Sequence, residues 1–182
     1  MKDFFYGLFK LISMCVIVIV LTLIVNLYIL QLVIVTGESM EPNFNNGDLL
    51  VVNKVKQLQD IDRYDIIVLK TNDKFHQYII KRVYGLPGET IQIKNSKIYV
   101  NGKEINDPYC KEKQFKPGIA DKVIQLKNDE YFILGDNRNA SADSRYENIG
   151  VVKGKDFMGE AFIGILPFKL DLKDFKEWNL RG

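Results

Sequence analysis

The sequence predicts a mainly β protein with one N-terminal transmembrane helix. Residues 11–35 form a run of 25 residues without a charged side chain. Beyond that run, short segments rich in β-branched residues alternate with turn residues, and no window shows a long helical period. We therefore expect an N-terminal tail over residues 1–10, a membrane helix over residues 11–35 and one partly barrel-like β domain over residues 36–182.

The uncharged run is long enough to cross a lipid bilayer. A helix of 25 residues extends about 37 Å, and the hydrocarbon core of a bilayer is about 30 Å thick. A cleaved leader segment would have a shorter apolar region of about 7–15 residues, followed by a small-x-small site. Residues 35–38, Val-Thr-Gly-Glu, offer no such site. We therefore expect the segment to remain as a single-pass anchor in the lipid bilayer of the plasma membrane.

The charges that flank the run predict its orientation. Lys2, Lys10 and the α-amine precede it, whereas the first charged residues after it are acidic and the first basic one is Lys54. Basic flanks tend to stay on the cytoplasmic side of a membrane. The sequence thus predicts a cytoplasmic N-terminus and an extracytoplasmic β domain.

The β domain should consist of short strands. They are expected at residues 49–55, 64–69, 75–84, 91–93, 97–100, 103–105, 123–126, 131–134 and 157–166. Asn101-Gly102 lies between two of these strands. A two-residue type I′ turn needs positive φ at both positions, and Asn-Gly is a strong signal for it. The pair therefore predicts a hairpin.

The composition excludes several classes of function. The net charge is +2, from 25 basic and 23 acidic residues, and no run of five basic residues occurs, so we expect no nucleic-acid partner. Cys15 lies inside the apolar run and Cys110 far outside it, so no disulfide is predicted. With one histidine and no cysteine spacing typical of a metal site, we expect neither a metal nor another cofactor.

Ser39 and Lys81 are the candidate catalytic pair. Ser39 lies in Gly-Glu-Ser-Met-Glu-Pro at residues 37–42, where a serine on its own would indicate only a turn. Residues two apart in a strand share a face, so Lys81 should point with Ile79 and Val83. Burial among such neighbours disfavours the cation and lowers the pKa of the lysine, as a lysine base requires. A lysine at an exposed strand edge is the alternative.

A serine–histidine protease would have to use His76, the only histidine in the chain. By alternation, His76 shares a face with Tyr78 and Ile80, opposite Lys81, and it lies at the start of its strand. We therefore interpret it as a solvated loop residue. The polar residues 135–145 are either an ordinary loop or a supporting layer that positions a catalytic group.

Together these segments resemble the bacterial type I signal peptidases, the leader peptidase family, in the single-span form of Gram-positive bacteria. The resemblance extends from the apolar run to about Phe168. Residues 37–42 resemble the nucleophile motif, and residues 81–89, Lys-Arg-Val-Tyr-Gly-Leu-Pro-Gly-Glu, resemble the lysine-base motif. Residues 135–145, Gly-Asp-Asn-Arg-Asn-Ala-Ser-Ala-Asp-Ser-Arg, match the last motif closely. Residues 47–52 and 165–168 are similar to two strand motifs of the family.

The resemblance implies a Ser-Lys dyad β fold and a serine endopeptidase that removes signal peptides from exported preproteins. Ser39 would be the nucleophile and Lys81 the general base. The resemblance also implies that Ser141 hydrogen-bonds the base, and that Asp143 and Arg145 pair to brace their loop.

Substrates of the family are cut after small residues, typically alanine-x-alanine. Small apolar pockets near Met40, Ile79 and Ile80 are expected to bind those residues. Gly37, Asn43 and Glu89 depart from the family pattern, where serine, threonine and aspartate respectively are found in some or many members. With Gly37, stabilisation of the oxyanion would depend on backbone N–H groups, chiefly that of residue 39.

Two other functions stay open from the sequence. A Ser-Lys protease of the self-cleaving repressor type shares the fold, but such proteins are soluble and carry a DNA-binding or cleavage segment not recognised in this sequence. A membrane-tethered β domain could instead bind partners or scaffold export machinery without catalysis. The combination of Ser39, Lys81 and Ser141 argues against that interpretation.

Overall fold

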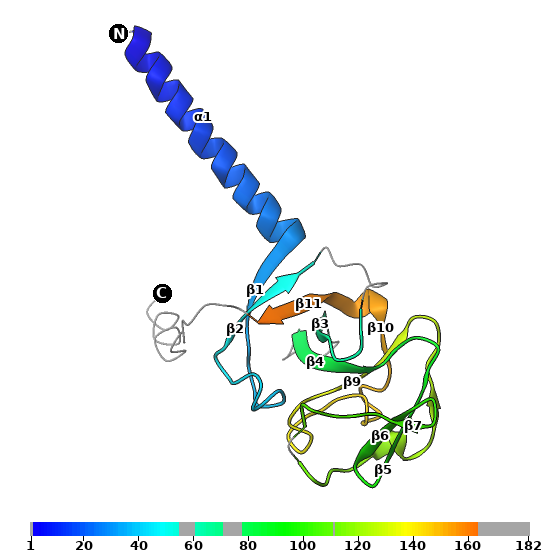
Figure 1. Cartoon of the computed structure of the whole chain (residues 1–182). Coiled ribbons are helices and arrows are strands. Elements are labelled where there is room, and N and C mark those ends of the chain that lie inside the picture. The colour runs from blue at the N-terminus through cyan, green and yellow to red at the C-terminus, as the bar shows by residue number, and fades with distance from the viewer. Residues whose placement is uncertain (1, 55–60, 71–77, 111, 164–182) are drawn as a thin grey trace.

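The computed structural model describes residues 2–54, 61–70, 78–110 and 112–163, and it has a long helix projecting from a β domain (Figure 1). Helix α1 (Lys2–Ile24) continues as one π-helical segment, η1 (Val25–Ile29). All strand pairs in the described residues are antiparallel. The prediction of a mainly β protein with one N-terminal apolar helix is confirmed.

The helical segment that could cross a bilayer is Phe4–Ile29, 26 residues with a mean hydropathy of 2.9. The side chains described for this segment are mostly exposed to the surroundings rather than packed against the β domain. The hydroxyls of Ser13 and Thr22 donate to the carbonyls of Phe9 and Val18, each four residues earlier. Such internal bonds satisfy hydroxyl groups that have no water to bind.

The expected helix over residues 11–35 is wrong at its C-terminal end. Strand β1 (Leu30–Ile34) follows the helix and pairs with β2 (Leu49–Asn53). Val33 and Ile34 are β-branched and favour a strand, and an edge strand with unpaired backbone groups cannot lie in the hydrocarbon core. The apolar run therefore contains a helical segment followed by a strand, and the lack of charge gives no sign of the boundary between them.

Apart from β10, which the sequence did not predict, the other strands match the predicted ones to within a few residues, where the structure describes them. Their bounds are β3 (Ile66–Lys70), β4 (Tyr78–Gly85), β5 (Thr90–Lys94), β6 (Lys97–Val100), β7 (Lys103–Glu104), β8 (Ile124–Gln125), β9 (Glu130–Leu134), β10 (Val152–Lys153) and β11 (Phe157–Ile163). Two short 3₁₀ helices, η3 (Gly118–Asp121) and η4 (Gly154–Asp156), connect strands. Residues 55, 75–77 and 164–168, which include His76 and the proposed closing motif, lie outside the described residues.

The strands form two sheets. The larger sheet has the order β1-β2-β11-β3-β4-β9-β10, and the smaller one has the order β7-β6-β5-β8 (Figure 1). Strands β1 and β10 are the two ends of the larger sheet, so within the described residues it stays open rather than closing into a barrel. The hairpin of β6 and β7 is confirmed, because Asn101 and Gly102 have φ of 50° and 76°.

Strand β4 lies in the middle of the larger sheet, between β3 and β9. Ile80 packs into one hydrophobic cluster with Met40 and Phe44, whereas Val83 packs into a second cluster with Ile67. Both faces of β4 are thus covered, and its side chains from residue 80 to residue 85 are all buried. A polar residue on this strand is held in the interior of the domain.

Candidate active site

The predicted nucleophile lies in a compact turn between β1 and β2. The turn is closed at its base by two backbone hydrogen bonds: the N–H of Val35 donates to the carbonyl of Asp48 at 2.8 Å, and the N–H of Gly47 donates to the carbonyl of Val35 at 2.9 Å. Met40 and Phe44 bury their side chains beneath it and share a backbone hydrogen bond of 2.9 Å. These contacts leave Ser39 partly exposed at the surface of the turn that faces β4.

Lys81 reaches this serine from β4. Its side chain is 3% exposed, and Nζ donates to Ser39 Oγ at 2.8 Å and to the carbonyl oxygen of Ile80 at 2.9 Å. The two residues that the sequence paired are thus in direct contact, although 42 positions separate them. An amine that donates to a hydroxyl oxygen in this geometry is placed to take the hydroxyl proton once the amine is neutral.

Burial lowers the pKa of Lys81 from 10.5 to about 8, and the carboxylates of Asp143 and Asp136 partly oppose this change. At its ordinary pKa, less than about 0.1% of a lysine is neutral at pH 7, whereas a pKa of about 8 makes roughly a tenth of it neutral. The environment of Lys81 therefore supplies a usable fraction of free amine near neutral pH.

An open groove of about 300 Å³ adjoins the Ser39–Lys81 contact. One wall is formed by residues 33–36 at the end of β1, and the other by residues 78–80 of β4. Met40, Ile79 and Ile80, the predicted substrate contacts, all line this groove. Because its lining is largely apolar and small in volume, it suits short uncharged side chains.

Asp143 and Arg145 form the ion pair that the resemblance implied. Arg145 Nε lies 2.7 Å from Asp143 Oδ1, Nη2 lies 2.9 Å from Oδ2, and both residues are fully or almost fully buried. Asp143 Oδ2 also accepts a hydrogen bond of 3.0 Å from the backbone N–H of Gly135. The pair therefore fixes the start of the 135–145 loop to its end.

Ser141 is close to the site but does not make the implied hydrogen bond. Its hydroxyl is buried and has no hydrogen-bond partner in the described part of the chain, whereas Lys81 donates elsewhere. A Cβ on Gly135 would lie 2.2 Å from Ser141 Oγ and 2.5 Å from the carbonyl oxygen of Ser39. Only glycine allows the loop and the nucleophile turn to approach so closely. A role for Ser141 in orienting the base stays a prediction.

A second buried ion pair, which the sequence analysis missed, lies beside the Ser39–Lys81 contact. Arg82 Nε and Nη2 donate to the two carboxylate oxygens of Asp136 at 2.8 and 2.6 Å, and both side chains are at most 5% exposed. The guanidinium group also stacks on Tyr109, with 3.6 Å between its central carbon and the ring centroid. The fixed fork of arginine matches a carboxylate, so this pair holds β4 against the 135–145 loop.

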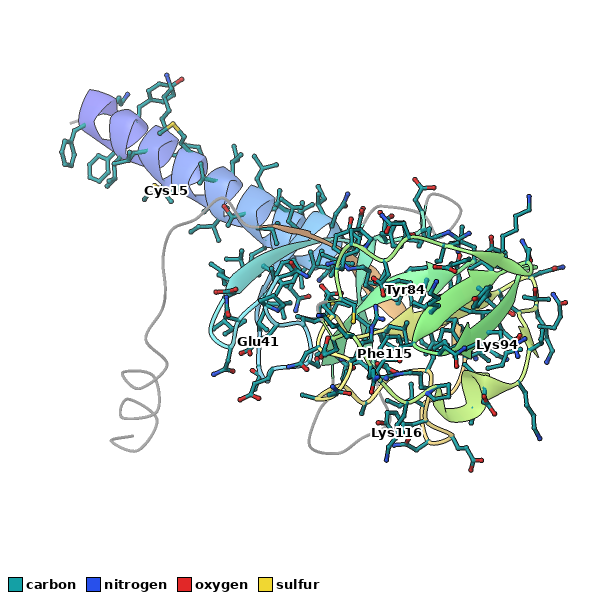
Figure 2. The ribbon with its side chains drawn as sticks, turned by 60° about the horizontal axis from the view of Figure 1, so that its bottom comes forward. Cys15, Glu41, Tyr84, Lys94, Phe115 and Lys116 are labelled. Atoms are coloured by element: carbon teal, nitrogen blue, oxygen red, sulfur yellow. The ribbon has the colours of Figure 1, made fainter. Side chains whose placement is uncertain are left out.

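A third buried charge supports the same loop from the side of the smaller sheet. Arg138 Nη1 lies 2.7 Å from Asp107 Oδ2, and its guanidinium carbon lies 4.8 Å from the centre of the Tyr84 ring. Tyr84 and Phe115 belong to the core cluster that joins the two sheets, and Figure 2 shows them close together in the domain interior. Three arginines thus hold one loop, and only the Asp143–Arg145 pair was anticipated.

The backbone N–H of Gly37 is not free to bind an oxyanion. It donates to Asn46 Oδ1 at 3.0 Å within the turn, where Gly37 has a φ of 98° that favours glycine. Stabilisation of the oxyanion by the N–H of residue 39 therefore remains the prediction.

The chain matches the family described as signal peptidase, peptidase S26, over residues 8–166. It is 39% identical over 159 residues to signal peptidase I P of Bacillus subtilis subsp. natto, which covers 83% of this chain and 85% of that protein. It is 35% identical over 162 residues to signal peptidase I S of Bacillus subtilis (strain 168), which covers 84% of this chain and 86% of that protein.

A crystal structure of a signal peptidase I from Enterococcus faecalis V583 is 29% identical, with a TM-score of 0.47, over 56% of this chain and 96% of that one. The family match spans more than half of the chain, and the curated relatives match it along most of their length. On these grounds the chain belongs to the signal peptidase family, peptidase S26.

Proposed function

We propose that this chain is a membrane-bound serine endopeptidase that removes N-terminal signal peptides from exported preproteins, with Ser39 as nucleophile and Lys81 as general base. The 2.8 Å contact between Lys81 Nζ and Ser39 Oγ carries the assignment of the two roles. The proposed reaction, removal of signal peptides, follows from family membership, because the relatives named above are signal peptidases.

The proposed chemistry is acyl transfer in two steps. Neutral Lys81 accepts the proton of Ser39 while Oγ attacks the carbonyl carbon of the scissile peptide bond, and the protonated amine then gives the proton to the leaving amine. Lys81 next takes a proton from water, which attacks the acyl-serine and releases the new carboxyl end. The second step restores the hydroxyl of Ser39.

The groove between β1 and β4 is the proposed binding site for the residues before the cut. Met40, Ile79 and Ile80 offer an apolar lining, and residues of both strands line the groove. Small residues fit such a lining, whereas a bulky or charged side chain would lose contacts or its hydration.

Mapping the cut in one model preprotein tests the function. Purified full-length protein in detergent is incubated with the preprotein, and the new N-terminus is identified by mass spectrometry. We expect one cut after a small residue with a small residue two positions earlier, and no cut with Ser39→Ala. Cleavage at unrelated positions, or none with wild type, would contradict the proposed function.

Cleavage is expected to increase with pH through about 8, because only neutral Lys81 can accept the serine proton. The profile of kcat/KM against pH, which reports groups of the free enzyme, is the measurement. Its rising part should be centred near pH 8. A rising part near pH 6.5 would instead point to His76, since that is the ordinary pKa of histidine.

Unfolding measured over the same pH range provides an independent check of Lys81. The pKa of this amine is 10.5 when unfolded and about 8 when folded, so folding must bury a cation below pH 8. Burying this cation lowers the free energy of unfolding by about 3 kcal/mol below pH 8. The cost decreases between pH 8 and 10.5 and is absent above pH 10.5. Lys81→Met should therefore be more stable than wild type at pH 7, and this advantage should vanish at high pH.

The apolar helix is the proposed membrane anchor, with the N-terminus in the cytoplasm and the β domain outside. Phe4–Ile29 is long enough to span a bilayer, and basic residues flank its N-terminal end. The exposed turn at Asn101 and Gly102 gives a test. Protease added to intact cells stripped of their wall should cut there, whereas protease enclosed on the cytoplasmic side should not. The reverse pattern would overturn the orientation.

A further inference from the structure

We propose that Asn43 is a positioning residue for the proposed nucleophile, which holds the Ser39 turn against the buried Arg82–Asp136 pair. The inference rests on the proposed role of Ser39. It concerns a residue that the sequence marked only as a departure from the family pattern, where threonine is common.

The side chain of Asn43 connects three parts of the fold. Its Nδ2 donates to Asp136 Oδ2 at 2.9 Å and to the backbone carbonyl of Tyr109 at 3.2 Å. Asp136 is completely buried, and both of its oxygens already accept hydrogen bonds from Arg82. The Asn43 amide therefore links the turn to the Asp136 carboxylate, which Arg82 in turn ties to β4, the strand that carries Lys81.

A second hydrogen bond ties the same turn to the same loop. The backbone N–H of Asn137 donates to the carbonyl oxygen of Ser39 at 3.1 Å. Asp136 and Asn137 are adjacent, so one dipeptide holds the turn at two points, Ser39 itself and Asn43 four residues later. Two attachment points restrict rotation of the turn as well as translation, which a single hydrogen bond would leave free.

The chemistry of the amide suits this place. One Nδ2 group carries two hydrogens, enough for the Asp136 carboxylate and the Tyr109 carbonyl together. An aspartate at residue 43 would have nearly the same shape, but it would have no donor and would bring a second carboxylate to about 3 Å from Asp136. Asn43→Ala therefore removes the hydrogen bond to Asp136, whereas Asn43→Asp replaces that hydrogen bond with repulsion between two carboxylates.

The placement of the turn matters because the dyad contact is short. Ser39 Oγ and Lys81 Nζ are 2.8 Å apart, and the two atoms come from elements joined through Asp136. A misplacement of about 1 Å in a reacting group can lower the rate about 100-fold. We expect Asn43→Ala to lower kcat about 10- to 100-fold, with KM changed less than about threefold, and Asn43→Asp to lower kcat at least as much.

The test measures kcat and KM on a peptide that spans a signal-peptide cleavage site, and the rate at which a serine-reactive probe labels Ser39. Both are measured on full-length protein under conditions where circular dichroism shows each variant folded. Asn139→Ala is the matched control. Its amide also joins the 135–145 loop to the segment that contains Tyr109, through Gln114, but it does not contact the Ser39 turn. This control should cleave and label like wild type.

Slower labelling and lower kcat in both Asn43 variants, with the control unchanged, is the expected result. A residue with a purely structural role would lower the unfolding midpoint and leave the labelling rate of the folded protein unchanged. That outcome overturns the proposal, as does an equal loss in Asn139→Ala. If Ser39→Ala remains active, the proposed function itself fails; if only the Asn43 variants behave like wild type, the positioning role alone fails.

Discussion

Replacing Lys81 by methionine is expected to abolish signal-peptide cleavage, and so is replacing Ser39 by alanine. Each change should lower kcat/KM by at least about 10⁴-fold, because the attack needs both an oxygen nucleophile and a base in contact with it. The two residues act as one unit through their 2.8 Å contact, so the double variant should be no worse than either single one. Methionine keeps the length and the apolar stem of lysine, so the fold should survive in the buried site.

Two control variants test whether the loss is specific to Lys81. Lys97 lies on β6, is about half exposed and pairs with Glu104, so Lys97→Met should leave kcat/KM within about twofold. His76→Ala should also be nearly silent if Lys81 is the base. Activity retained in Lys81→Met, or lost in His76→Ala, would contradict the Ser39–Lys81 assignment.

Much of the candidate site could be anticipated because its residues lie in segments with clear local patterns. Alternation in β4 places Ile79 and Val83 in contact with one cluster and Ile80 with another, as strand geometry requires. The same pattern offered a buried face for Lys81 but left an exposed strand edge open, and the structure shows the residue buried. The pattern did not anticipate that Arg82, on the opposite side, would be buried too, because alternation alone does not show that both faces of a strand are covered.

The end of the membrane helix could not be read from the sequence for a related reason. Residues 30–34 are as apolar as the helix before them, so hydropathy contains no boundary. What makes them a strand is pairing with Leu49–Asn53, a partner that lies beyond the Ser39 turn. The turn at Asn95 and Ser96, by contrast, is local: it joins β5 to β6, with φ of 49° and 59° and no glycine to signal it.

Ion pairs between residues far apart in the sequence could likewise not be predicted from local sequence patterns. Asp136 was visible as part of a polar loop, but its partner Arg82 is 54 positions earlier, in the segment that resembles the lysine-base motif. The family resemblance gave the pair of Asp143 and Arg145, which are two residues apart. It gave no account of Tyr109, whose ring covers Arg82 from a segment without regular structure.

Breaking the Arg82–Asp136 pair from one side should cost about 3–5 kcal/mol of unfolding free energy. Asp136→Asn removes the countercharge while Arg82 stays about 5% exposed, so a buried cation is left without a carboxylate. Urea unfolding at pH 7 measures the loss. The double variant Arg82→Met, Asp136→Leu removes both charges and fills a similar volume, so its loss should be clearly smaller than that of Asp136→Asn.

The same substitution provides a second readout at the dyad, because the Asp136 carboxylate raises the pKa of Lys81 against the larger effect of burial. Removing that negative charge favours the neutral amine. The rising part of the pH–rate profile of Asp136→Asn should therefore move below about 8, even though kcat falls from loss of alignment. A profile that stays in place, together with an unfolding free energy within about 1 kcal/mol of wild type, would show that the pair is effectively solvated and does not support the site.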